Sequence, residues 1–136
     1  MARPGAVAGL GTIAAAAITI TLVLIKAQGP TGASASAARG MTGGGDAHRG
    51  RAALRKYGCS SCHTIPGVLG ADGLVGPPLT SLGARTYLAG ALPNTPENLV
   101  RWIRYPQEIR PPNAMPNLGV TEEDGRDMAA YLYTLR

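Results

Sequence analysis

Two cysteines and a histidine form the pattern Cys59-Ser60-Ser61-Cys62-His63 near the middle of the 136-residue chain. Thiols at this spacing lie about one helical turn apart, so both can form thioethers with the vinyl groups of one porphyrin. The histidine that follows then lies under the ring and offers a neutral imidazole nitrogen to iron. The pattern predicts one covalently attached haem c, bound through Cys59 and Cys62, with His63 as an iron ligand.

Three other uses of neighbouring cysteines fit this sequence less well. A structural zinc site takes about four ligands, but the chain has two cysteines, and its other histidine is His48. A thioredoxin-like redox pair follows a strand in a βαβ unit, and no such pattern is present. A disulfide between residues three apart closes too small a loop to add much stability. The sequence therefore favours haem attachment.

A six-coordinate haem iron needs a second protein ligand, and Met115 is the candidate. It lies in a loop where no helical periodicity calls for a buried thioether, and prolines that stiffen the loop surround it: Pro111, Pro112 and Pro116. The other methionines lie at the N-terminus, in a Gly-rich segment and in a predicted helix: Met1, Met41 and Met128. We expect His63 and Met115 to be the metal ligands.

Residues 1–26 are predicted to form a transmembrane anchor. Residues 5–25 carry no charge, and about 20 apolar residues span the hydrocarbon core of a bilayer. A secretory signal peptide has a shorter apolar region, of about 7–15 residues. The small-residue motifs Ala33-Ser34-Ala35 and Ala35-Ser36-Ala37 could be cleavage sites, but they lie far beyond the apolar run. We expect an uncleaved helix.

The rest of the chain divides into two parts. Residues 27–47, rich in Gly, Ala and Ser, are predicted to be a flexible tether, and residues 48–136 a single small domain. All six aromatic residues lie in this second part, from Tyr57 onward. A segment of about 90 residues buries a modest core. We therefore expect the haem to be its largest hydrophobic group, and the domain not to fold without it.

The domain is predicted to be all-α, with long loops. A first helix is expected over residues 50–58. A second starts at Pro96 with Thr95 as its cap and ends at Pro106. A third opens at Thr121 with an acidic first turn and runs to the end of the chain, and residues 110–119 form a loop. No segment alternates at period two, and such long loops in a small domain usually surround something.

The charge pattern argues against a nucleic-acid partner. The formal net charge is +5, but the basic residues are not interleaved with stacking aromatic residues over a surface. Two local clusters exist, a basic one within residues 49–56 and an acidic one within residues 122–127. A negatively charged partner or a membrane surface is one use of the basic charge, but both clusters are interpreted as solvated helix faces.

Together these motifs resemble a class I monohaem cytochrome c, over residues 50–135. The resemblance is carried by Gly50-x-x-x-Leu54, Cys59-x-x-Cys62-His63, Gly76-Pro77-x-Leu79, Asn98-Leu99-x-x-Trp102-Ile103, Ala114-Met115-Pro116 and Ala130-Tyr131-Leu132. It implies a small fold of three to five helices around one haem. The first and last helices would cross, packing Gly50 and Leu54 against Tyr131 and Leu132.

The resemblance also assigns three further haem-binding residues. The backbone carbonyl of Pro77 would accept the ring N–H of His63. Arg85 and Trp102 resemble residues that bond haem propionates. With Cys59, Cys62, His63 and Met115, they complete the expected cofactor site.

A narrower group is similar over residues 92–97 and 115–118, namely the cytochrome c domains joined to subunit II of some bacterial haem-copper oxidases. This similarity implies an electron-transfer protein of the respiratory chain, with no small-molecule substrate and no enzymatic activity of its own. A quinol-oxidising cytochrome bc-type complex would be the donor and a terminal oxidase the acceptor. The alternatives are a fixed haem subunit of a larger complex and, in another class, a five-coordinate haem sensor or peroxidase.

The expected location follows from haem attachment, which takes place outside the cytoplasm. The chain would cross the bacterial cytoplasmic membrane once, with its N-terminus inside and its haem domain on the periplasmic or outer side. Membrane lipid would contact the N-terminal helix.

Overall fold

The computed structural model of the protein describes residues 31–136. The predicted anchor, residues 1–26, lies outside this range. Within residues 31–136 there is no helix of the length and apolarity that crossing a bilayer requires.

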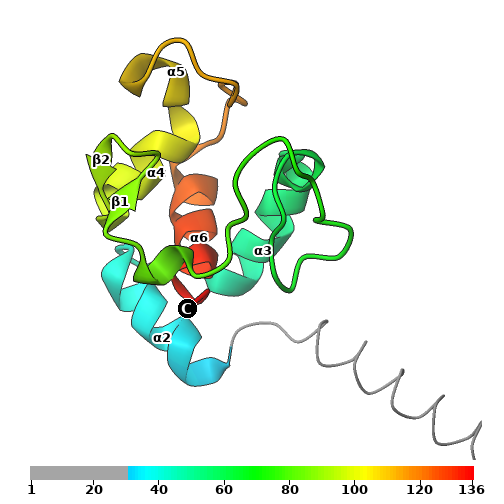
Figure 1. The fold of residues 1–136 in the computed structure, drawn as a ribbon. Helices are drawn as coiled ribbons and strands as arrows, with labels where there is room; N and C mark the ends of the chain where they lie inside the picture. The colour runs from blue at the N-terminus through cyan, green and yellow to red at the C-terminus, as the bar shows by residue number, and fades with distance from the viewer. Residues whose placement is uncertain (1–30) are drawn as a thin grey trace, which may run out of the picture.

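Helix α6 lies at the centre of the fold, with α3 on one side, α4 on the other and α2 against its C-terminal end (Figure 1). The described residues begin with two helices, α2 (Gly32–Met41) and α3 (Ala47–Lys56). Two 3-10 turns follow, Cys59–Ser61 and Leu82–Ala84, and then two short strands, β1 (Tyr87–Leu88) and β2 (Leu92–Pro93). The chain ends with three helices, α4 (Pro96–Arg104), α5 (Pro106–Ile109) and α6 (Glu122–Tyr133).

Helices α3 and α6 make the most extensive contact between elements, as expected for the first and last helices of the predicted domain. Gly50 lies against the backbone of α6. A Cβ at Gly50 would overlap the carbonyl oxygen of Asp127 and lie 2.9 Å from the backbone nitrogen of Met128, one turn before Tyr131. Leu54, Tyr131 and Leu132 are all buried in the same core. Gly50 therefore sets how closely the two helices approach.

The start of α3 differs from the prediction of a helix over residues 50–58. The helix begins at Ala47 because Asp46 caps it, its carboxylate accepting hydrogen bonds from the backbone N–H groups of His48 and Arg49. An aspartate at this position satisfies amides that have no partner within the helix. The helix ends at Lys56, and Gly58 follows with a positive φ of 71°.

The caps of the other long helices are confirmed. The Thr95 hydroxyl accepts from the backbone N–H of Asn98 at the start of α4, where Pro96 occupies the first helical position. The Thr121 hydroxyl accepts from the N–H of Asp124 at the start of α6. Pro106 follows the end of α4 as expected, but it also begins the short helix α5, since proline suits a first helical position.

The all-α prediction needs one correction. Strands β1 and β2 pair antiparallel, with Tyr87 opposite Pro93 and Leu88 opposite Leu92. The turn between them has positive φ at Ala89 and Gly90, as hairpin turns of type I′ require. Two residues per strand are too few to produce a visible alternation, which is why the sequence did not predict them.

The prediction of a flexible tether over residues 27–47 is wrong for Gly32–Met41, which forms α2. This helix packs against α6, with Ala38 only 1% exposed and Thr42 only 4%. The Thr42 hydroxyl donates to the carbonyl of Ala38, and the Arg39 guanidinium lies 3.8 Å from the Asp46 carboxylate. Small side chains allow α2 to approach α6 closely, a contact that composition alone did not indicate.

The basic and acidic clusters are paired with each other across α3 and α6. Arg49 donates to both carboxylate oxygens of Asp127, at 2.7 and 3.0 Å. Lys56 Nζ donates to Asp124 at 2.9 Å. Asp127 is only 1% exposed, so its cluster is not simply a solvated face.

Candidate haem site

The Cys-x-x-Cys-His motif forms a tight turn directly after α3. Gly58 allows the chain to reverse, and the backbone N–H of His63 then donates to the carbonyl of Cys59 at 3.0 Å. Cys59 and Cys62 are both free thiols. Burial raises the pKa of the Cys59 thiol to about 11, so at neutral pH it carries its proton.

The His63 ring is held by the loop that follows the motif. Its Nδ1 lies 2.8 Å from the carbonyl oxygen of Pro77, the contact that the resemblance implies. A carbonyl oxygen can only accept, so Nδ1 carries a proton, and in the neutral imidazole this leaves the lone pair on Nε2. Gly76 is needed for this approach because a Cβ there would lie 2.6 Å from Nδ1 of the ring.

A cavity of about 620 Å³ opens beside this motif. The residues predicted for the site from five separate stretches of sequence all line it: Cys59, Cys62, His63, Pro77, Arg85, Trp102 and Met115. Most of the remaining lining is aliphatic and comes from α3, α4, α6 and the connecting loops, including Leu54, Leu99, Ile103, Met128 and Leu132. The structure thus brings the whole predicted set to one apolar cavity.

Two arginines are the charged residues that line this cavity within residues 31–136. Arg85 donates through Nη2 to the carbonyl of Thr80 at 3.0 Å and to that of Pro78. Arg110 donates through Nη1 to the carbonyl of Ala89 at 2.6 Å. Sequence reasoning missed Arg110, and the available signal was its position as the first residue of the predicted ligand loop.

Met115 lies half-buried on the loop of residues 110–119, which has no regular secondary structure, as predicted. Its backbone N–H donates to Oδ1 of Asn113 at 2.8 Å, and its carbonyl accepts from Nε2 of Gln107 at 2.7 Å. Sequence reasoning missed these two amide residues. The signal was their position among prolines, where few backbone groups can pair with one another.

The sequence model of the cytochrome c family matches residues 47–136, two thirds of the chain. The chain belongs to the cytochrome c family. Its cofactor is therefore haem c with iron, and its chemistry is electron transfer, as the attachment motif predicts.

Two curated relatives carry similar cytochrome c regions. One is the cytochrome c oxidase subunit 2 of Alkalihalophilus pseudofirmus, 38% identical over 91 residues. The other is the cytochrome c oxidase subunit 2 of Bacillus sp. strain PS3, 32% identical over 94 residues. Each match covers 66% of this chain and 26% of the relative, so the chain spans about a quarter of the relatives' length. The similarity to oxidase-linked cytochrome c domains is thus confirmed.

The donor set and the cavity fit a haem c. Both thiols are unpaired, one imidazole nitrogen is left as a lone-pair donor, and a thioether lines the same cavity. The aliphatic lining suits a porphyrin face, and the two arginines suit its carboxylates. The requirement for glycine at Gly76 fits too, because the ring of His63 occupies the space of a side chain there.

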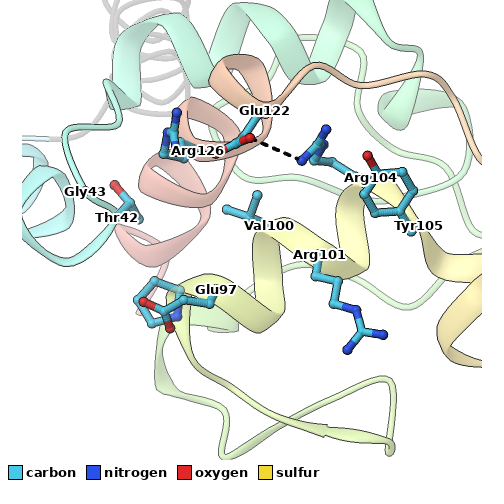
Figure 2. Close-up of a pocket in the computed structure, with 10 residues that line it drawn as sticks. Thr42, Gly43, Glu97, Val100, Arg101, Arg104, Tyr105, Glu122 and Arg126 are labelled. Carbon is cyan, nitrogen blue, oxygen red and sulfur yellow. Dashed lines mark hydrogen bonds and ion pairs between the residues drawn. The ribbon is translucent and has the colours of Figure 1, made fainter.

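A second hollow, of about 410 Å³, lies on a different face of α4. Its charged groups are largely paired: Arg104 lies 3.7 Å from the Glu122 carboxylate, and Arg126 donates to Glu122 at 2.6 Å. Figure 2 shows these groups together, with Arg101 turned away from them. This hollow contains none of the predicted site residues, so the cavity beside Cys59–His63 is the candidate haem site of this cytochrome c.

Proposed function

We propose that this protein is a membrane-anchored c-type cytochrome that carries single electrons from a quinol-oxidising cytochrome bc-type complex to a terminal oxidase. The observation that carries the proposal is the convergence of Cys59, Cys62, His63 and Met115 on one apolar cavity. Bound haem c supplies a one-electron iron couple. A carrier needs no substrate pocket beyond such a site.

The residues around the cavity have separable roles. Cys59 and Cys62 hold the cofactor through thioethers, and His63 supplies Nε2 to iron while Pro77 fixes its tautomer and orientation. Met115 supplies a thioether, and ligation by His and Met favours the ferrous state and raises the reduction potential. The aliphatic lining keeps water away and lowers the local dielectric constant.

Arg85, Arg110 and Trp102 are proposed to hold the haem propionates. Both arginines line the cavity and are fixed in place by bonds to loop carbonyls, which leave other guanidinium N–H groups to donate. Charge-assisted hydrogen bonds from arginine to a carboxylate are among the stronger polar contacts.

The place of the protein in a cell rests on the sequence and on the relatives. The apolar residues 5–25 support a single N-terminal anchor, N-in, with the haem domain on the periplasmic or outer side. The relatives are oxidase subunits, which supports a terminal oxidase as acceptor. The same similarity equally favours the second candidate function, a fixed haem subunit of a larger membrane complex.

A reductive titration of the full-length holoprotein, followed by optical spectra, tests the ligand set. The oxidised wild type should show the far-red Met–iron band, which Met115→Ala should abolish while lowering the potential. Met41→Ala, at an exposed methionine of α2, is the matched control and should retain the band. A band that is absent from wild type, or that survives in Met115→Ala, would contradict the assignment of Met115.

Membrane preparations separate the two candidate functions. The reduced carrier should reduce oxidase-containing membranes, and after solubilisation it should be lost from the oxidase on mild washing. Stoichiometric co-purification with one enzyme would favour the fixed subunit instead. Failure to reduce any oxidase membrane would count against the carrier.

A further inference from the structure

The loop that carries Met115 is held by side-chain amides instead of backbone pairs. Within the described residues, no backbone-to-backbone hydrogen bond joins residues 111–119 to another segment or to one another. Three prolines in this stretch, at 111, 112 and 116, lack the N–H that such a bond needs. Another source of order must therefore fix the position of Met115.

Gln107 supplies one half of that order. It lies half-buried on α5, and its side-chain Nε2 donates to the carbonyl of Asn113 at 2.8 Å and to that of Met115 at 2.7 Å. One amide nitrogen thus fixes the two carbonyls on either side of Ala114. The backbone N–H of Gln107 donates to Oδ1 of Asn117 at 3.3 Å, and this bond attaches the far side of the loop to the same helix.

Asn113 supplies the other half. Its Nδ2 donates to the carbonyls of Pro106 and Arg110, at 2.9 and 2.7 Å, at the two ends of α5. Its Oδ1 accepts the backbone N–H of Met115 at 2.8 Å. Both backbone polar groups of Met115 are therefore bonded to side-chain amides, one on α5 and one on the loop itself.

We propose that Gln107 and Asn113 are positioning residues that hold Met115 against displacement from iron. The inference rests on the proposed ligand role of Met115. Because the amides bind its backbone, they restrict the loop to the conformation that brings the thioether to the cavity. Without them the loop samples other conformations, and an external ligand competes with Met115 more successfully.

Imidazole is the probe, added to the oxidised full-length holoprotein and followed by loss of the far-red band. Gln107→Leu keeps the side-chain size but removes the two hydrogen bonds. Two neutral hydrogen bonds together correspond to roughly a tenfold change in an equilibrium constant or more. We expect imidazole to bind Gln107→Leu at least about tenfold more tightly than wild type.

Two more variants make the test specific. Asn113→Asp keeps an acceptor for Met115 N–H but places a carboxylate, which cannot donate, against the carbonyls of Pro106 and Arg110, so it too should bind imidazole more tightly than wild type. It also tests the proposal if Gln107→Leu does not accumulate. Asn98→Ala is the matched control because Asn98 also donates an amide to a backbone carbonyl, that of Pro93, away from Met115. It should bind imidazole as wild type does.

The outcomes separate the two proposals. Met115→Ala sets the upper limit of imidazole affinity. If Met115→Ala binds imidazole like wild type, the ligand assignment fails. If Met115→Ala binds more tightly but Gln107→Leu and Asn113→Asp stay within about twofold of wild type, Met115 is a ligand and the positioning role is overturned. Urea unfolding of each variant distinguishes a local effect from loss of global stability.

Discussion

Gly50 of α3 contacts the backbone of Asp127 on α6 so closely that no side chain fits between the two helices. A Cβ at this position would overlap the Asp127 carbonyl, and the obstacle is backbone, which cannot rotate away as a side chain can. This contact fixes the separation of the two helices that carry Leu54, Met128 and Leu132 to the haem cavity. The geometry of the site therefore depends on a residue that does not line it.

Gly50→Ala should destabilise the holoprotein by about 3 kcal/mol or more, because one of the helices must move to accommodate a methyl group. Urea unfolding followed by circular dichroism measures the loss. Gly40→Ala is the control, since Gly40 lies in α2 and a Cβ added there would have nothing within 4 Å. That substitution should be neutral or slightly stabilising. Equal unfolding midpoints for the two variants would refute the close-contact interpretation.

Asp127→Ala should also be destabilising, by about 2–3 kcal/mol, because it leaves the backbone N–H of Asp46 without its carboxylate acceptor. The carboxylate accepts from Arg49 and from the backbone N–H of Asp46, so one residue joins α6 to the start of α3. Glu123→Ala is the control: Glu123 is exposed and lies 4.0 Å from Arg49. It should cost less than about 0.5 kcal/mol. Similar losses for both would show that Asp127 acts as a surface charge.

Sequence reasoning succeeded where the signal is local. The caps at Thr95 and Thr121 are decided within four residues, and the motif that indicates the cytochrome c family within five. Met115 is a less local case, since its prediction as an iron ligand rested on its place among prolines and on the need of haem iron for a second ligand. The structure places Met115 on the lining of the cavity beside Cys59.

The features that sequence reasoning missed depend on tertiary contacts. Ala38 looks like any linker alanine until α2 lies on α6. Asp127 looks like one member of an exposed acidic run until Arg49 approaches from another helix. Gln107 and Asn113 acquire their roles only because the loop folds back onto α5. None of these contacts leaves a periodic pattern in the chain.

The docking of α2 can be tested by placing a charge at its buried position. Ala38→Glu puts a carboxylate where 1% of the residue is exposed, so we expect α2 to detach, since an unpaired buried charge is costly. Ala37→Glu is a matched control one residue away, at an exposed position of the same helix. Limited proteolysis should then cleave Ala38→Glu within residues 32–41 much faster than Ala37→Glu. Equal cleavage rates would indicate that the segment is a flexible tether after all.

Stability should fall at high pH because of two tyrosines on α6. Burial raises the pKa of Tyr133 to about 12 and raises that of Tyr131. The folded state thus keeps these protons when the unfolded chain releases them, so stability is lost as pH rises from about 10 towards 12. Urea unfolding at about pH 8 and about pH 11 measures the slope.

Tyr133→Phe identifies the residue responsible for part of that slope. At neutral pH this variant should be about 1 kcal/mol less stable to unfolding than wild type, because it lacks the hydrogen bond from the Tyr133 hydroxyl to Asn94. Above pH 10 its stability should fall less steeply than that of wild type. Tyr87→Phe, at the exposed tyrosine of β1, controls for removal of a hydroxyl. A Tyr133→Phe slope equal to the wild-type slope would contradict the assignment.

The last prediction concerns the dependence of the fold on its cofactor. The cavity of about 620 Å³ is bordered by side chains from α3, α4 and α6, the helices that form the core. Without the cofactor the apolar side chains of this cavity lose their main packing partner, and burial of apolar surface is the dominant source of the small net stability of a domain. Cys59→Ala/Cys62→Ala, which cannot attach haem, should therefore lose most of its helical circular dichroism and become protease-sensitive. Ser60→Ala, a change inside the same motif that leaves both thiols, should fold normally. A double variant with wild-type helicity would show that the protein side chains alone are a sufficient core.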